Sequence, residues 1–163
     1  MSLFFAKNFK YSEVRCPCGC GKDRPLKPGM TFALQALRNR VDSPIYITSG
    51  GGIRCIEYNK KIGGYIRSPH LIGSAVDIHS RAYDIITLAK YAVEAGFLRV
   101  GLYPYNNFIH VDVEMPSPSK SWVRNKRGHY KYFLTVKEAI AWIDKLEKFK
   151  PLNPLKALVH KHS

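Results

Sequence analysis

The sequence predicts an α+β domain with a small mixed or antiparallel sheet and flanking helices. Helical patterns occur towards both ends of the chain, and short apolar runs of β type lie between them. Two of these runs are joined by a short turn, which indicates a hairpin and therefore an antiparallel strand pair. The 163 residues suit one core, so we expect a single domain over residues 1–150 and a basic, flexible tail over 151–163.

The first half of the chain contains one clear helix and one strand. After a turn-rich entry at Phe9–Asp23, residues 30–40 place their apolar side chains on one helical face. Pro44–Thr48 is a short β-type run, and it leads into the flexible glycine-rich loop Ser49–Gly52.

A strand and a second helix follow. Ala75–His79 is an apolar run typical of a strand, and residues 83–95 have the apolar spacing of a helix. Gly96 stands where a glycine commonly ends a helix, which supports that boundary.

The second half adds the predicted hairpin and a last helix. Val100–Tyr103 and Phe108–Val113 are β-type runs that flank a turn at residues 104–107. Thr135 and Glu138 have capping-box spacing and predict a helix that begins there and continues through Leu146.

The composition is strongly basic. Lys and Arg number 26 against 12 Asp and Glu, a formal net charge of +14, which favours a polyanionic partner. An anionic cell wall and nucleic acid are the candidates, although a basic surface that is merely solvated gives the same count. Nucleic acid is the weaker candidate, because neither an RNA-binding aromatic signature nor a DNA-binding motif is present.

No apolar run approaches the length needed to cross a bilayer, and the N-terminus lacks the pattern of a signal peptide. We therefore expect no membrane span and leave the localisation open. We also expect a monomer.

Cysteines are unusually dense in one segment. Cys16, Cys18 and Cys20 alternate with other residues, and Cys55 follows much later. Reduced thiols in a tight turn, one disulfide to Cys55 and a structural metal held by all four are the alternatives. Structural zinc usually has wider spacing between paired cysteines, so the spacing does not decide among them.

Two histidines and an aspartate form the most informative pattern. His70 lies on a loop, while Asp77 and His110 lie within apolar strands. A buried carboxylate needs a partner, and a metal ion supplies one. Two imidazoles and one carboxylate make a three-ligand zinc shell whose fourth position is left to water, and such a water becomes a nucleophile near neutral pH.

The spacing resembles that of the zinc D-alanyl-D-alanine carboxypeptidase and L-alanyl-D-glutamate peptidase family. These are cell-wall peptidases whose fold is shared with hedgehog signalling domains. The resemblance covers most of residues 9–122 and rests on these motifs: Ser12-Glu13, Leu37-Arg38, Ile47-Thr48-Ser49-Gly50 leading to Arg54, Asn59, Gly63-Gly64, Ser68-x-His70, Gly73-x-Ala75-x-Asp77, Gly101-x-Tyr103, Phe108-Ile109-His110-Val111-Asp112 and Trp122.

The resemblance implies a role for each matching residue. His70, Asp77 and His110 would bind one catalytic Zn²⁺, and Arg54 would contact the substrate near the scissile bond. Ser68 would bind substrate or shape its loop, and Trp122 would line the substrate groove or belong to the core. One departure concerns Arg54, because the family segment is Ser-Gly-x-Arg and this chain has an extra pair of residues before the arginine.

The general base is the second departure. Several branches of the family have an acidic residue or a histidine three positions before the last zinc histidine, where this chain has Asn107. Asp112 is the candidate base instead, because residues two apart in a strand face the same side and Asp112 would share the pocket of His110. The alternative is that Asp112 orients His110 through its ring N–H.

These patterns favour a zinc metallopeptidase of the D-Ala-D-Ala carboxypeptidase or murein endopeptidase type. Its partners would be peptidoglycan peptides and the anionic wall. A non-catalytic zinc-containing module that binds the cell wall or a polyanion is the alternative, since one fold can serve several functions.

Overall fold

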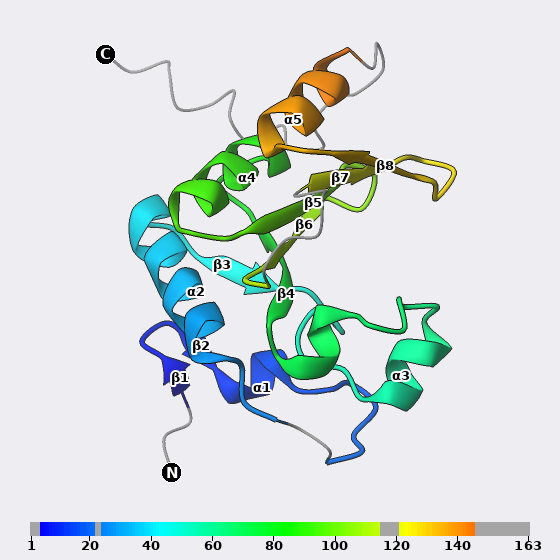
Figure 1. Cartoon of the computed structure of the whole chain (residues 1–163). Coiled ribbons are helices and arrows are strands. Elements are labelled where there is room, and N and C mark those ends of the chain that lie inside the picture. The colour runs from blue at the N-terminus through cyan, green and yellow to red at the C-terminus, as the bar shows by residue number, and fades with distance from the viewer. Residues whose placement is uncertain (1–3, 22–23, 115–120, 146–163) are drawn as a thin grey trace.

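The computed structural model describes residues 4–21, 24–114 and 121–145 (Figure 1). The proposed tail at 151–163 lies outside the described residues, so the division into domain and tail stays a prediction. The helices are α1 (Tyr11–Val14), α2 (Pro28–Val41), α3 (Ile56–Lys61), the 3₁₀ helix η1 (Pro69–Ile72), α4 (Ile85–Glu94) and α5 (Val136–Asp144). The strands are β1 (Phe4–Ala6), β2 (Phe9–Lys10), β3 (Ile45–Ile47), β4 (Ala75–Ser80), β5 (Arg99–Tyr103), β6 (Phe108–Asp112), β7 (Ser121–Arg124) and β8 (Tyr130–Phe133).

A six-stranded sheet forms the centre of the fold. Its strand order is β3-β4-β6-β5-β7-β8, and every pair is antiparallel except β5 with β7. The short strands β1 and β2 form a separate antiparallel pair. The predicted α+β class with a mixed sheet is confirmed, as is the hairpin, which consists of β5 and β6.

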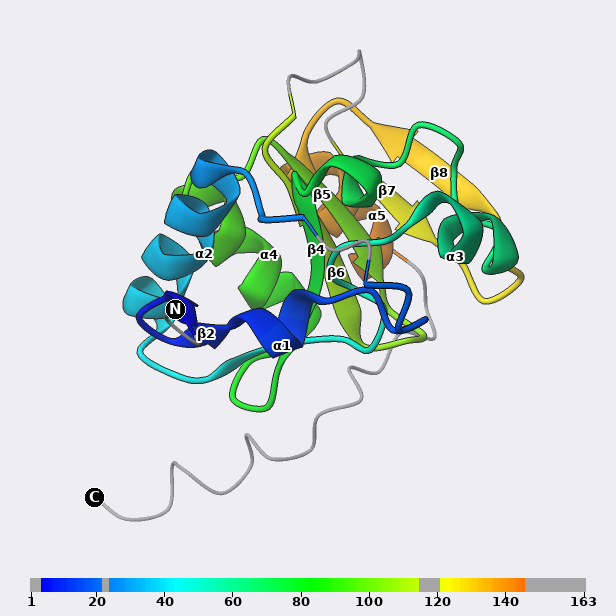
Figure 2. The same ribbon diagram turned by 90° about the horizontal axis from the view of Figure 1, so that it is seen from below.

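The two faces of the sheet have different neighbours. Helices α2, α4 and α5 pack together and cover one face, whereas α3 lies on the other side (Figure 2). Alternate residues of the central strands point into the core beneath α4; these are Val76, Ile78, Val100, Leu102, Ile109, Val111 and Val123. The period of two in a strand therefore directs the intervening residues to the opposite face, where the polar side chains gather.

Local signals in the sequence mark the helix ends. Asp84 caps α4 by accepting a hydrogen bond from the backbone N–H of Thr87, and Gly96 has φ +94° just after that helix. The capping box of Thr135 and Glu138 opens α5, as predicted. The sequence reading missed α1, which lies within the predicted turn-rich entry, together with α3, η1, β1, β2, β7 and β8, all of which are six residues or shorter.

Shortening a side chain in the core beneath α2 will cost substantial stability. Leu34 is fully buried, so we expect Leu34→Ala to lower the free energy of unfolding by about 3 kcal/mol, through lost apolar burial and the cavity left behind. Phe32, in the same helix, is 75% exposed, and Phe32→Ala should change stability by less than about 0.5 kcal/mol. Chemical denaturation at fixed zinc concentration measures both, and equal effects would contradict the assigned packing of α2.

Candidate metal centre

The centre of the candidate site is one row of residues that runs across four strands. In the strand register Asp77 of β4 lies opposite His110 of β6, which lies opposite Gly101 of β5, which in turn pairs with Trp122 of β7. Residues in one such row point to the same face, here the face away from α4. Residues far apart in sequence are thus brought together by backbone pairing alone.

His70 joins this row from outside the sheet. It lies in η1, which begins at Pro69 and ends at Gly73 with φ +70°. A side chain at position 73 would strike the carbonyl oxygen of Pro25, so glycine is required by both conformation and space. The His70 ring is buried and lies edge-on to the ring of His110, with centroids 4.9 Å apart.

Three ligand atoms converge at one point. His110 Nδ1 lies 2.9 Å from Asp77 Oδ1 and 3.1 Å from His70 Nε2, and the same Asp77 oxygen lies 3.3 Å from His70 Nε2. The far nitrogen of each ring has its own acceptor: His70 Nδ1 lies 2.8 Å from the carbonyl oxygen of Gly52, and His110 Nε2 lies 3.1 Å from Asp112 Oδ2. Because a neutral imidazole has one N–H, these outer acceptors leave a lone pair on each inner nitrogen.

The donor set fits zinc. Two nitrogens and one carboxylate oxygen are zinc ligands, and spacings of 2.9–3.3 Å are near those of neighbouring ligands around a single ion. Within the described parts of the chain this cluster contains three ligands, which is the number typical of a catalytic zinc with an open position.

The electrostatics of the cluster favour a bound cation. Burial acts to lower the pKa of His110, but hydrogen bonds to Asp112 and Asp77 outweigh it and raise that pKa above its ordinary value. Burial acts to raise the pKa of Asp77, but His70, His110 and their hydrogen bonds bring it well below its usual range. Asp77 is therefore a carboxylate at neutral pH, whereas burial lowers the pKa of His70 below its ordinary value and favours the neutral ring that can bind a metal.

Arg54 reaches the cluster despite the extra residues in its loop. Its Nη2 donates to Asp77 Oδ2 at 2.7 Å, and its Nε donates to the carbonyl oxygen of Gly50 at 2.8 Å. The Arg54 backbone N–H also donates to the carbonyl oxygen of His70. The arginine thus holds the carboxylate oxygen that faces away from the two histidines.

Asp112 faces the same pocket as His110, as the spacing of two predicted, but it is fully buried. Arg99 lies opposite it in the register and donates from Nε to both carboxylate oxygens, at 2.8 and 2.9 Å. Oδ2 also accepts from His110, and Oδ1 from the backbone N–H of Glu114. Both oxygens are already engaged, and these contacts favour the orienting role over that of a general base.

Trp122 lies over the backbone of Gly101. A Cβ atom at position 101 would come within 2.2 Å of the indole ring, so the missing side chain makes room for it. The indole lies 5.1 Å from the His110 ring and donates from Nε1 to the hydroxyl of Tyr103. Gly101 is the one member of the row to which the sequence reading gave no role.

Ser68, the remaining candidate, and the nearby His79 lie at the margins of the site. Ser68 is buried at the start of η1, two residues before His70. His79 stacks on Tyr46 at the β3 side of the sheet, with ring centroids 5.3 Å apart. Among the described contacts of His79, none reaches the three-ligand cluster.

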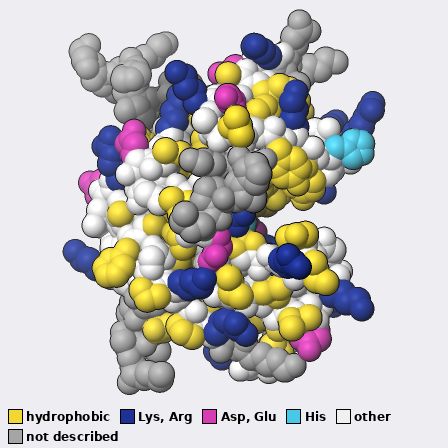
Figure 3. All heavy atoms as spheres, in the orientation of Figure 1, with side chains coloured by type: hydrophobic (Ala, Val, Ile, Leu, Met, Phe, Trp, Pro, Cys, Tyr) yellow, Lys and Arg dark blue, Asp and Glu magenta, His cyan; other side chains and the backbone are white. Residues whose placement is uncertain are grey.

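A cleft lies between the two sides of the site. Figure 3 shows it as a notch between the β7–β8 side and the α3 side, with hydrophobic side chains on both. Tyr130 and Tyr132 of β8 are exposed on one side, and Ile56, Tyr65 and Ile66 on the other. Trp122, which lies beside the His110 ring, and Arg54, which bonds to Asp77, come from these two sides.

The geometry agrees with comparison to known proteins. The sequence model of the family described as peptidase M15 matches residues 7–112, which include the three ligands, Arg54 and Asp112. The chain belongs to the peptidase M15 family. This confirms the resemblance found in the sequence, and with it the expected fold.

Two characterised relatives share part of this region. The zinc D-Ala-D-Ala carboxypeptidase of Streptomyces albus G is 34% identical over 84 residues, which cover 49% of this chain and 32% of that enzyme. The peptidoglycan L,D-endopeptidase MepK of Escherichia coli K12 is 28% identical over 108 residues, covering 62% of this chain and 57% of MepK. The chain therefore spans less than two thirds of either relative. No helix in the described residues is long and apolar enough to cross a membrane.

A side chain at position 101 will displace the indole of Trp122. In a Trp142→Phe background, where Trp122 alone reports, we expect Gly101→Ala to shift the tryptophan emission and to destabilise the protein by about 1–3 kcal/mol through overpacking. Gly29→Ala is the matched control, because its Cβ would meet only Val113, at 3.9 Å. An unchanged emission spectrum in Gly101→Ala would show that Trp122 does not lie over this glycine.

Proposed function

We propose that the protein is a zinc-dependent peptidase that hydrolyses peptide bonds in the stem peptide or cross-link of peptidoglycan. The observation that carries the proposal is the convergence of His70, Asp77 and His110 beside Arg54. The family assignment makes a metallopeptidase the natural reading of this geometry. The names of both relatives point to peptidoglycan as the substrate class.

The three ligands would hold the ion through His70 Nε2, Asp77 Oδ1 and His110 Nδ1. When bound there, zinc supplies a Lewis acid for the scissile carbonyl and lowers the pKa of a water molecule. The protein's part is to fix the donor atoms. The Gly52 carbonyl sets the ring of His70, and Asp112 sets the ring of His110.

Arg54 would bind the substrate while its Nη2 keeps its hydrogen bond to Asp77. Its Nε and Nη2 are engaged with the Gly50 carbonyl and Asp77, and among the described contacts none uses Nη1. That nitrogen can donate to a carbonyl oxygen that becomes negative during hydrolysis, or to a peptide carboxylate. The side chain is 13% exposed, so it is not completely closed off from solvent.

The rest of the cleft would bind the peptide and the wall. Trp122 and Ser68 flank the ligands from opposite sides of the site and would contact the substrate. The net charge of +14 would concentrate the protein on an anionic cell wall, with an affinity that falls as salt rises. Lys and Arg side chains are spread over the face shown in Figure 3 rather than gathered in one patch.

The central test is cleavage of purified cell-wall sacculi. We expect the zinc-loaded protein to release soluble muropeptides and a chelator to abolish the release. Mass spectrometry of the products distinguishes the two reaction types: loss of a single terminal residue indicates a carboxypeptidase, and cleavage within the stem or cross-link indicates an endopeptidase. His110→Ala serves as the inactive control.

Binding without cleavage would support the alternative. If the protein sedimented with sacculi in a salt-sensitive manner but released no peptide with zinc bound, it would be a non-catalytic wall-binding module. The feature in favour of that outcome is Asn107, which stands where several family branches have an acid or a histidine.

A second test separates the two roles of Asp112. If Asp112 orients His110, Asp112→Asn should weaken zinc binding by about 10-fold or more, while activity recovers at saturating zinc. If it is the general base, zinc binding should change little and kcat should remain low at any zinc concentration. Glu114→Gln is the control, because Glu114 bonds to Lys27 and should alter neither quantity. Zinc titration and peptide-release kinetics measure both effects.

A further inference from the structure

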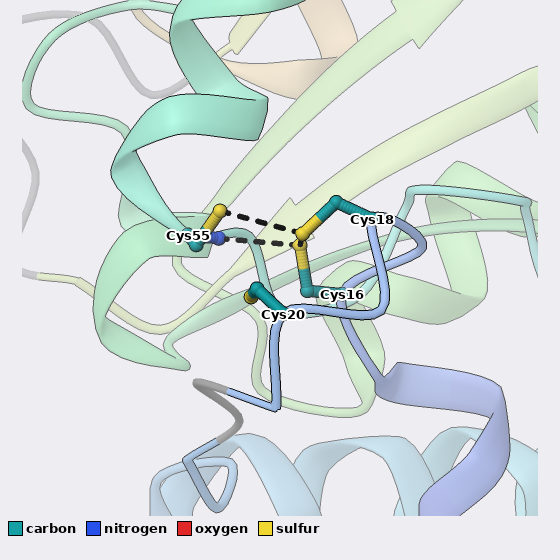
Figure 4. Close-up of side chains that lie close together, drawn as sticks. All are labelled: Cys16, Cys18, Cys20 and Cys55. Carbon is teal, nitrogen blue, oxygen red and sulfur yellow. Dashed lines mark hydrogen bonds between the residues drawn. The ribbon is translucent and has the colours of Figure 1, made fainter.

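The cysteines form a second cluster outside the candidate active site. Figure 4 shows Cys16, Cys18 and Cys20 on the loop after α1 and Cys55 at the start of α3, with all four side chains close together. Cys16 Sγ lies 3.2 Å from Cys18 Sγ, and Cys18 Sγ lies 3.6 Å from Cys55 Sγ. All four sulfurs lie within 4.8 Å of one another, and all four are free thiols.

This spacing is that of a metal centre. Zinc–sulfur bonds of about 2.3 Å place the sulfurs of a tetrahedral site about 3.8 Å apart. A disulfide joins sulfurs at about 2.05 Å and satisfies only two of four cysteines. Four sulfurs within 4.8 Å of one another, from two separate chain segments, match the first arrangement better than the second.

The loop conformation explains how such close spacing in sequence can work. The segment turns at Pro17 and Cys18, and Gly19 and Gly21 both adopt positive φ, at +69° and +66°. The backbone N–H of Gly19 bonds back to the carbonyl of Cys16, so the segment curls around its own sulfurs. These glycines allow cysteines at this close spacing, which left the three alternatives undecided in the sequence, to bring their sulfurs together.

Backbone donors also face the sulfurs. The N–H of Cys55 lies 3.4 Å from Cys16 Sγ, and the N–H of Tyr58 lies 3.3 Å from Cys55 Sγ. N–H···S hydrogen bonds of this kind stabilise metal-bound thiolates, and such supporting contacts orient the ligands. Cys16 and Cys55 are buried, whereas Cys18 and Cys20 are exposed.

We propose that Cys16, Cys18, Cys20 and Cys55 bind a structural Zn²⁺ as a tetrathiolate site. It would tie the segment after α1 to the residue that follows Arg54. Next to it, the Ile53 backbone N–H donates to the carbonyl of Val14 at 2.7 Å, and Gly52 packs directly on Val14. The metal would therefore fasten the loop that carries Arg54 and the Gly52 carbonyl, without touching the substrate.

Metal stoichiometry tests this proposal on the full chain, purified under reducing conditions with zinc. We expect native mass spectrometry to find two zinc ions per wild-type chain and one in the Cys18→Ser/Cys20→Ser double variant. The double variant alters only exposed residues, so its fold should persist. With cobalt(II) in place of zinc, the wild type should show the thiolate charge-transfer absorption of a sulfur-ligated site, and the double variant should lose it.

The result does not depend on the peptidase activity. His110→Ala should lose one metal ion yet keep the thiolate absorption, whatever the reaction of the enzyme. A single zinc in the wild type with the same count in the cysteine double variant would overturn the proposal. So would a mass two hydrogens lower under these conditions, which would reveal a disulfide instead.

Discussion

The buried negative charge of Asp77 is the constraint on which the site depends. A carboxylate in the interior of a sheet is costly unless its oxygens are paired. One oxygen of Asp77 faces His70 and His110, and the other accepts from Arg54. The residues implied in metal binding and substrate contact are therefore the same residues that make this charge tolerable in the fold. Loss of Arg54 would disturb the metal position as well as any contact with substrate.

Three consecutive glycines supply the backbone that holds these groups. The carbonyl of Gly50 accepts from Arg54 Nε, that of Gly51 from the backbone N–H of Asp77, and that of Gly52 from His70. Each of the three carbonyls thus positions a different member of the site. The loop connects β3 to α3, and Cys55 of the proposed cysteine centre follows it at the start of α3.

Part of this arrangement could be predicted from the sequence, because the period of two along a strand determines which side chains share a face. The alternation in β6 placed His110 and Asp112 on one face, whereas Asp77 was identified by its residue type and by the family resemblance; helix caps such as Thr135 have local signals that need no tertiary context. The elements that were missed are short, and they form only because neighbouring elements hold them. β7 is an example, since its parallel pairing with β5 brings Trp122 over Gly101.

Contacts between segments that are distant in sequence could not be predicted from the local pattern of residues. Nothing in the local pattern shows that Arg99 would meet Asp112, because that pairing is set by the register of β5 against β6. The extra residues before Arg54 made its position uncertain in the sequence. In the structure the glycine loop absorbs them, and the guanidinium still reaches Asp77.

That accommodation has a consequence for how the loop can vary. A Cβ at position 51 would collide with Thr48 and Asp77, and one at position 52 with the backbone of Val14. The longer loop therefore fits only if the residues at these positions are glycines, which have no side chain. Random mutagenesis of codons 51 and 52 would therefore recover glycine almost alone.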